Sequence, residues 1–104
     1  MNMMTIPPRP ALLDVQQQDM LIGGKRVPAL SGKRFETRNP ATNELLATVA
    51  QGGAEDVDRA VKAARAAFEG PWRRMKPVER QRIMLRLADL VEEHFEELAM
   101  LDTL

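Results

Sequence analysis

The order of apolar and polar residues divides the chain into a β-rich first half and a helical second half. Between residues 20 and 51, short alternating runs are bounded by Gly, Pro and Asn, which is typical of half-buried strands joined by tight turns. Beyond residue 53, apolar residues recur at helical spacing. The pattern therefore predicts an α+β fold, in which short antiparallel β-hairpins precede two α-helices.

The β-rich segment, residues 20–51, is predicted to contain two hairpins. Gly23 and Gly24 can adopt the positive φ angles of a two-residue turn between short strands. In the second hairpin, Pro40 pushes Asn39 into an extended conformation, and Asn43 tolerates a left-handed geometry. The residues between them are expected to turn the chain from one strand into the next.

The helical segment, residues 52–104, is predicted to form helices over residues 54–69 and 77–104. The first helix has one apolar face, formed by Val57, Ala60, Val61, Ala64 and Phe68. The second has a broader apolar face, formed by Ile83, Leu87, Leu90, Val91, Phe95, Leu98 and Leu101. The pattern does not decide whether the second helix breaks near Glu93 and His94.

The charges of the second helix oppose its dipole. Between Arg73 and Arg86 there are six basic residues and a single acidic one, whereas between Leu87 and Leu104 there are six acidic residues and no basic ones. Cations near a helix N-terminus and anions near its C-terminus are unfavourable, and like charges four residues apart cost about 0.2–0.5 kcal/mol per pair. We therefore expect this helix to be held by contacts with protein outside these 104 residues.

Composition limits the function classes. Three Phe and one Trp supply few large core side chains, so a stand-alone core would be thin. Fifteen acidic and fifteen basic residues cancel, which argues against nucleic-acid and anionic-membrane partners.

Residues 1–19 are rich in Pro, Gln and Met and are predicted to form a flexible leader. This leader lacks the features of a secretory signal, so we expect a cytoplasmic protein.

Candidate chemistry is sparse. The chain contains no cysteine. His94 is its single histidine and lies among glutamates, so we expect a solvated surface rather than a metal site. The glycine pairs lack the spacing of phosphate-binding loops. The basic stretch from Trp72 to Arg86 contains one aromatic residue, which favours a helix anchor with surface arginines over a nucleic-acid site.

A series of short motifs nonetheless resembles the amino-terminal part of the aldehyde dehydrogenase superfamily, over about residues 20 to 104. In chain order the motifs are Leu21-Ile22-Gly23-Gly24-Lys25, Ser31-Gly32-Lys33, Asn39-Pro40-Ala41-Thr42-Asn43-Glu44, Ala54-Glu55-Asp56-Val57-Asp58-Arg59-Ala60-Val61, Ala64-Arg65-Ala66-Ala67-Phe68, Trp72, Glu79-Arg80, Leu87-Ala88-Asp89-Leu90 and Leu98-Ala99. Each motif alone is weak, but their order and spacing are specific to that superfamily.

The resemblance implies a piece of a larger α/β fold, in which the two-helix segment belongs to the cofactor-binding domain. Members of the family use NAD or NADP to oxidise aldehydes to carboxylic acids through a cysteine thiolate, and they are homo-oligomers. Their catalytic and main cofactor-binding regions lie outside the matched part. No catalytic or cofactor-binding residue is therefore assigned here, and the chain is expected to be inactive alone, to bind no cofactor alone and to be capable of self-association.

Two further expectations follow from the resemblance. Some members hold a monovalent cation between backbone oxygens at the positions matching Thr37 and Arg38, together with an acidic residue that would lie beyond Leu104. An incomplete cation site is therefore expected here. The alternative to an enzyme fragment is a stand-alone helical interaction module without catalysis, which predicts a cooperative melt and a defined oligomer.

Overall fold

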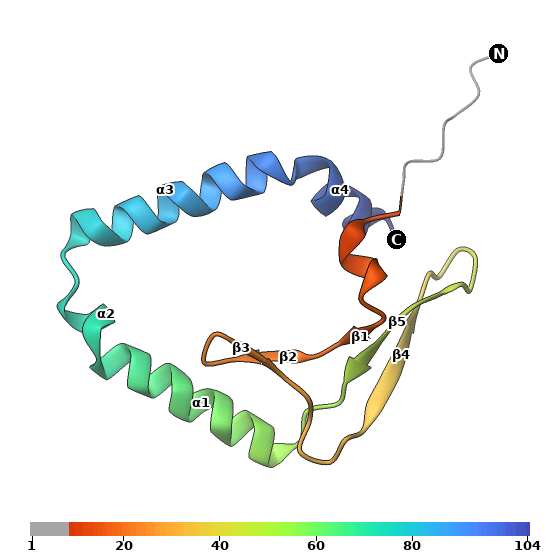
Figure 1. The fold of residues 1–104 in the computed structure, drawn as a ribbon, viewed down its shortest axis with the longest axis horizontal. Coiled ribbons are helices and arrows are strands. Elements are labelled where there is room, and N and C mark those ends of the chain that lie inside the picture. The colour runs from red at the N-terminus through yellow and green to blue at the C-terminus, as the bar shows by residue number, and fades with distance from the viewer. Residues whose placement is uncertain (1–8) are drawn as a thin grey trace.

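The computed structural model describes residues 9–104 and confirms the α+β fold class (Figure 1). A 3-10 turn and five strands precede four helices. In chain order these are η1 (Ala11–Asp14), β1 (Gln17–Gln18), β2 (Met20–Ile22), β3 (Lys25–Val27), β4 (Arg34–Arg38), β5 (Leu45–Ala50), α1 (Ala54–Glu69), α2 (Pro71–Arg74), α3 (Pro77–Glu93) and α4 (Phe95–Thr103).

The strands form two small sheets. Strands β2 and β3 are an antiparallel hairpin, and β1, β5 and β4 form a three-stranded sheet in that order. Within the larger sheet β4 is antiparallel to β5, with Phe35 opposite Val49. Strand β1 is parallel to β5, with Gln17 opposite Thr48. The sequence pattern predicted antiparallel hairpins, and the parallel pairing of β1 adds a long-range contact that it did not reveal.

The predicted turn residues adopt the predicted geometry. Gly23 and Gly24 have φ angles of 60° and 76°, as a two-residue hairpin turn requires. Asn43 has a φ of 59°, which confirms the left-handed conformation expected at this position. The Asn39 side chain accepts a hydrogen bond from the Ala41 N–H at 2.9 Å, and this Asx interaction helps to bend the chain between β4 and β5.

The second part of the predicted leader carries η1 and β1, and residues 1–8 of that leader lie outside the described residues. The side chain of Arg34 on β4 holds this segment against the sheet. Its guanidinium donates to the carbonyl oxygens of Gln18 and Thr48 at 2.9 and 3.1 Å. It also forms an ion pair with Asp19 at 2.9 Å. Because these bonds come from a residue far along the chain, local sequence features give no sign of them.

The helical half differs from the predicted pair of helices in two places. Helix α1 has the expected bounds, but Pro71 then starts the additional short helix α2. The predicted second helix, residues 77–104, is divided into α3 and α4 at His94, whose φ of −108° and ψ of 20° are not helical. The break that the pattern left open therefore exists, and α4 turns back towards the beginning of the chain (Figure 1).

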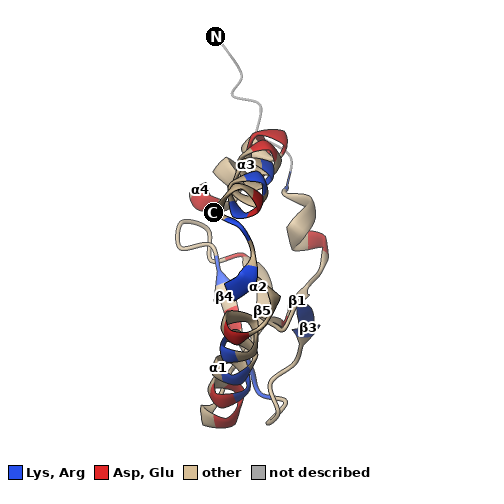
Figure 2. Ribbon diagram, turned by 90° about the vertical axis from the view of Figure 1, so that its left-hand side faces the viewer, with Lys and Arg blue, Asp and Glu red and all other residues tan. Residues whose placement is uncertain are grey.

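The molecule is an open, flat ring rather than a compact domain. Its Cα radius of gyration is 17.9 Å, whereas a compact chain of this length has a value of about 13 Å. Its extents are 58 × 38 × 17 Å, and the edge-on view in Figure 2 shows how thin it is. The buried apolar side chains of residues 9–104 are small or few, namely Leu13, Ala29, Ala47 and Ala50. The core is therefore confined to the β half and its junctions.

Candidate functional site

Thr37 and Arg38, the residues expected to offer backbone oxygens to a cation, lie at the end of β4. The register with β5 shifts between them, so this is an irregular point of the sheet. The Arg38 guanidinium pairs with Glu36 at 2.6 Å and donates to the Asn43 carbonyl oxygen at 3.1 Å. Within residues 9–104, no group of three or more His, Asp or Glu side chains is placed to hold a metal ion. Cation binding at Thr37 and Arg38 stays a prediction.

Asp56 is the one charged side chain that is buried among the described residues, with 3% exposure. Its two carboxylate oxygens accept hydrogen bonds from the Gly53 and Leu30 N–H groups at 2.9 and 3.1 Å. The hydrogen bond from Gly53 lowers the pKa of the Asp56 carboxyl most, while its burial acts in the opposite direction. Both oxygens are used by backbone donors, so this carboxylate is a structural anchor and not a general acid or base.

The predicted basic patch, Trp72 to Arg86, is organised around Arg80. The Arg80 guanidinium lies 5.5 Å from the centroid of the Trp72 ring. It also donates to the carbonyl oxygens of Trp72 and Arg73 at 3.1 and 3.3 Å. Arg80 thus satisfies the last carbonyls of α2 and ties α2 to α3, as cations at helix C-termini do. This geometry fits the predicted role of Trp72 as an anchor between helices.

His94 and the neighbouring glutamates are exposed, with one exception. The Glu97 carboxylate accepts a hydrogen bond from the Leu12 N–H at 2.9 Å, which joins α4 to η1. His94 Nδ1 lies 3.5 Å from the same carboxylate. The expectation that all of these glutamates are merely solvated is therefore wrong for Glu97, because its partner is a backbone donor 85 positions earlier in the chain.

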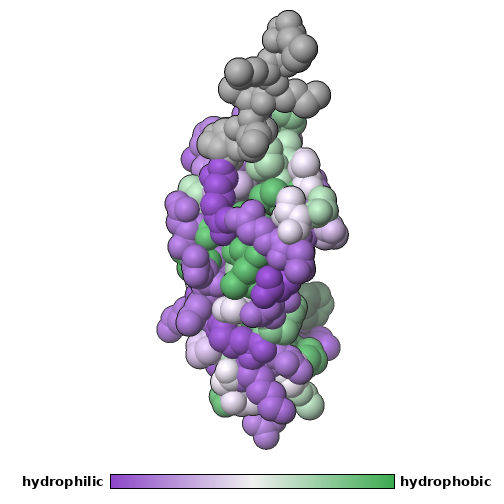
Figure 3. All heavy atoms as spheres, turned by 90° about the vertical axis from the view of Figure 1, so that its right-hand side faces the viewer, coloured by the Kyte–Doolittle hydropathy of each residue, from purple (hydrophilic) through white to green (hydrophobic). Residues whose placement is uncertain are grey.

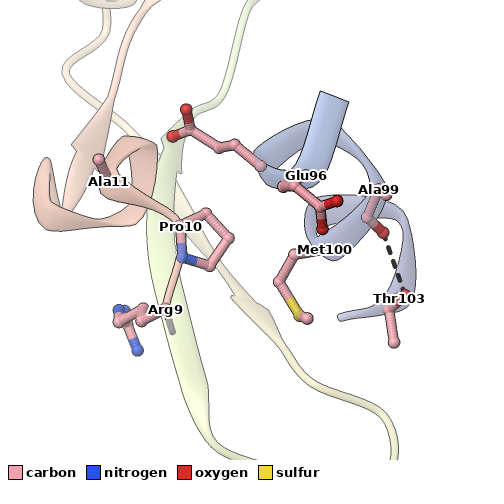
Figure 4. Close-up of a pocket in the computed structure, with 8 residues that line it drawn as sticks. Arg9, Pro10, Ala11, Glu96, Ala99, Met100 and Thr103 are labelled. Carbon is pink, nitrogen blue, oxygen red and sulfur yellow. Dashed lines mark hydrogen bonds between the residues drawn. The ribbon is translucent and has the colours of Figure 1, made fainter. Parts of the chain in front are cut away.

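A cavity of about 380 Å³ lies beside this junction, between residues 9–11 and α4. Figure 4 shows Pro10 and Met100 facing it from opposite sides, with Arg9 and Glu96 at its edges. A hydrogen bond between the Thr103 hydroxyl and the Ala99 carbonyl completes the α4 side. The cavity is lined by two carboxylates, Glu96 and Glu97, and by no histidine or cysteine. The Glu97 carboxylate is the one that accepts the hydrogen bond from Leu12.

The helices of the structure leave many large apolar side chains uncovered. None of the residues of α3 or α4, which together run from Pro77 to Thr103, is buried. Large apolar side chains on the helices are more than one-third exposed: Val57, Val61, Phe68, Ile83, Met84, Leu85, Leu87, Leu90, Val91, Phe95 and Leu98. Figure 3 shows hydrophobic side chains among hydrophilic ones on one edge of the ring. Many large apolar side chains left uncovered on helices are typical of a site of protein contact.

No helix within residues 9–104 is both long enough and apolar enough to span a lipid bilayer. The exposed apolar residues alternate with charged ones around each helix, as they do on α1, where Lys62 pairs with Asp58 at 2.6 Å. The apolar stripes are thus one side of amphipathic helices, which pack against protein.

Comparison with known proteins identifies a family that shares this architecture. A model of the aldehyde dehydrogenase family matches residues 27–104. A mitochondrial aldehyde dehydrogenase of Arabidopsis thaliana is 55% identical over 92 residues, which cover 88% of this chain and 17% of the plant protein. A putative aldehyde dehydrogenase of Bacillus subtilis is 57% identical over 86 residues, which cover 82% of this chain and 17% of the bacterial protein.

Solved structures of the same family share this fold. An aldehyde dehydrogenase of Bacillus cereus, determined as an NAD+ complex, aligns with a TM-score of 0.86 at 49% identity. The alignment covers 92% of this chain and 20% of that structure. The chain therefore spans about a fifth of the length of the relatives it matches.

Proposed function

The chain belongs to the aldehyde dehydrogenase family, and we propose that it forms the amino-terminal structural part of an NAD(P)+-dependent enzyme that oxidises an aldehyde to a carboxylic acid. The observation that carries this proposal is the uncovered apolar surface of α3 and α4. These helices have the fold of a family member at 49% identity, yet no residue of either is buried within the described chain. Their apolar sides fit contact with the remainder of such an enzyme.

The role of this part is structural. Aldehyde oxidation through a covalent intermediate requires a nucleophile, a donor that stabilises the oxyanion and a base within reach of one another. The 104 residues contain no cysteine. The buried carboxylate of Asp56 is occupied by backbone donors. We therefore propose that these residues alone neither bind the dinucleotide nor turn over an aldehyde.

The same proposal includes a monovalent cation near β4. The carbonyl oxygens of Thr37 and Arg38 would supply two ligands, and the rest of the enzyme would supply an acidic one. The irregular register between these residues supports the proposal, because it turns backbone oxygens away from regular ladder geometry.

We also propose that the enzyme is a cytoplasmic homo-oligomer. Cell fractionation tests the location, since the Arabidopsis thaliana relative is mitochondrial.

The proposal is tested with the purified chain. It is incubated with NAD+ or NADP+ and a set of aliphatic and aromatic aldehydes, and the absorbance of reduced cofactor is followed, with a full-length family member as the positive control. No reduced cofactor should form with the chain alone. Turnover by these 104 residues would overturn the structural role, because they contain no cysteine thiol for the covalent step.

A further inference from the structure

We propose that one hydrogen bond acts as a latch, which holds the helical arm, residues 71–104, shut against the amino-terminal segment. The donor is the Leu12 N–H on η1 and the acceptor is the Glu97 carboxylate on α4, 2.9 Å away. When the latch opens, the arm swings about the bend between α1 and α2. The latch is a contact within the chain, separate from the apolar stripes that the remainder of the enzyme would cover.

The η1 side of the latch is fixed to the sheet. Gln18 Nε2 donates to the carbonyl oxygens of Leu12 and Val15 at 3.0 and 2.6 Å. Just before η1, the Arg9 guanidinium donates to the Leu46 carbonyl oxygen on β5 at 3.1 Å. Leu12 therefore presents its N–H from a segment that is tied down on both sides.

The Glu97 side chain differs from the acidic side chains around it. It is 29% exposed, whereas Glu92, Glu93 and Glu96 are all exposed. The Leu12 N–H lies in the first turn of η1, and N–H groups in the first turn of a helix have no acceptor within the helix itself. The Glu97 carboxylate supplies that acceptor, so the latch satisfies a donor that would otherwise depend on water.

The arm has no other polar link to the β half. Among residues 9–104, the bond between Leu12 and Glu97 is the one hydrogen bond or ion pair that joins residues 71–104 to residues 9–53. Beside it lies the cavity of about 380 Å³ that Pro10 and Met100 face from opposite sides (Figure 4). Because a cavity and not a packed core borders the bond, the junction can open without breaking up a core.

The pivot at the other end of the arm is Gly70. A Cβ at this position would lie 2.9 Å from the Ala66 carbonyl oxygen, so the close bend between α1 and α2 requires glycine. Arg80 of α3 donates to the carbonyl oxygens of Trp72 and Arg73 in α2 at 3.1 and 3.3 Å. Helix α2 therefore moves with α3, and the turning point is the glycine that precedes α2.

The closed ring has the shape that this part has in a complete family member, since it aligns with the Bacillus cereus enzyme at a TM-score of 0.86. The latch thus holds α3 and α4 where the remainder of the enzyme would receive them. Ordering a segment before contact lowers the cost of binding. This consequence for assembly rests on the proposed function, whereas the latch itself does not.

The test measures the distance between η1 and α4 in the 104-residue chain. Because the chain has no cysteine, spin labels on Val15→Cys and Asp102→Cys report one pair of exposed sites by pulsed electron paramagnetic resonance. With Glu97 intact, the distance distribution should be single and narrow. Glu97→Ala should raise the ratio of open to closed chains about tenfold, since hydrogen bonds to charged groups are among the stronger ones.

Three comparison variants separate the latch from packing and from misfolding. Glu96→Ala removes the neighbouring carboxylate, which lines the same cavity but, within residues 9–104, has no hydrogen bond to η1. Leu12→Ala keeps the N–H donor and loses the side chain. Both should keep the narrow distribution. Glu97→Gln keeps an acceptor without the charge and should open less than Glu97→Ala, and far-UV circular dichroism should show the same helix content throughout.

A second pair of labels locates the pivot. Lys62→Cys on α1 and Asp89→Cys on α3 lie on either side of Gly70. Opening about Gly70 should therefore lengthen their distance when Glu97→Ala is introduced. If only the distance to Asp102 changes, the chain moves at the His94 break, and the pivot at Gly70 is wrong.

Three results would overturn the latch. These are a broad distribution with Glu97 intact, a narrow one in Glu97→Ala, and opening in Leu12→Ala or Glu96→Ala that equals that of Glu97→Ala. Oxidation of an aldehyde by the chain alone would instead refute the proposed function, and it would leave these distances unchanged.

Discussion

Asp56 Oδ1 accepts a hydrogen bond from the Leu30 backbone N–H at 3.1 Å, and this contact joins the first turn of α1 to the loop between β3 and β4. The second oxygen, Oδ2, accepts from the Gly53 N–H at 2.9 Å and caps the same helix. One carboxylate therefore fixes how the helical half leaves the β half. Asp56 is nearly inaccessible to water, at 3% exposure.

Replacing Asp56 should loosen this junction. In Asp56→Ala, two backbone N–H groups lose their acceptor, and the cost is greatest for a group that water does not reach. We expect a lower midpoint of thermal unfolding by circular dichroism. The matched control is Asp58→Ala on the same helix, since within residues 9–104 Asp58 pairs only with Lys62 and both side chains are exposed, at 59% and 76%. Equal losses in the two variants would contradict the anchoring role.

The junction should also be sensitive to acid. The pKa of Asp56 is lowered, chiefly by the hydrogen bond from Gly53. A carboxyl with a lowered folded-state pKa stabilises the fold above its unfolded pKa, about 3.9, and this stability is lost as the pH falls through the folded-state pKa. The stability difference between wild type and Asp56→Asn should therefore be constant from about pH 7 to pH 5 and shrink below about pH 4. Urea titrations at each pH measure it; narrowing already above pH 5 would refute the assignment.

Removing Arg34 should release the segment before β2. Its guanidinium carries the bonds to Gln18, Asp19 and Thr48, and its side chain is only 21% exposed. We expect Arg34→Ala to lower the free energy of unfolding by about 2 kcal/mol, since hydrogen bonds to charged groups contribute about 1.5–3 kcal/mol. Amide hydrogen exchange in residues 9–19 should become faster.

Arg38→Ala is the control for that experiment. Arg38 lies on the same strand, but its side chain is 42% exposed and its ion pair is with a residue two positions away. The loss should be below about 1 kcal/mol, as for exposed ion pairs. Exchange in residues 9–19 should not change. If it rises as much as in Arg34→Ala, the effect belongs to the sheet as a whole and not to the Arg34 contacts.

Substitutions of Asn43 test whether the β4–β5 turn requires a left-handed backbone conformation. Its φ of 59° is in the left-handed region, which costs a residue with a branched side chain about 1–2 kcal/mol. Asn43→Gly should leave the unfolding free energy unchanged or slightly raised, whereas Asn43→Val should lower it by about 1–2 kcal/mol. Chemical denaturation of both variants checks this, and equal stability of the two would mean that the turn adopts another conformation.

Local features of the sequence predicted the local structure well. The glycine pair, Asn43 and the apolar spacing of residues 54–69 each act through backbone geometry or the helical repeat, which a short window contains. The family was recognisable for a related reason, because several short motifs kept one order along the chain, and the match to residues 27–104 confirms it. The break at His94 was harder to predict from the sequence, because one non-helical residue scarcely disturbs the apolar spacing of the helix.

The contacts that close the ring were beyond sequence reasoning. Arg34 meets Gln18, Asp56 meets Leu30 and Glu97 meets Leu12 across many intervening residues. Each is a charged side chain that could equally have been solvated, so its partner depends on where the backbone brings it.

The sequence by itself determined the two hairpins, their turns, the long amphipathic helices and the conflict of charge along α3, because these depend on neighbouring residues. The tertiary structure alone decided which of those surfaces remain uncovered. A helix with an apolar stripe can be buried or exposed, and only the packed arrangement shows that no residue of α3 is buried against the described chain. The proposed contact of α3 with the remainder of the enzyme rests on that exposure.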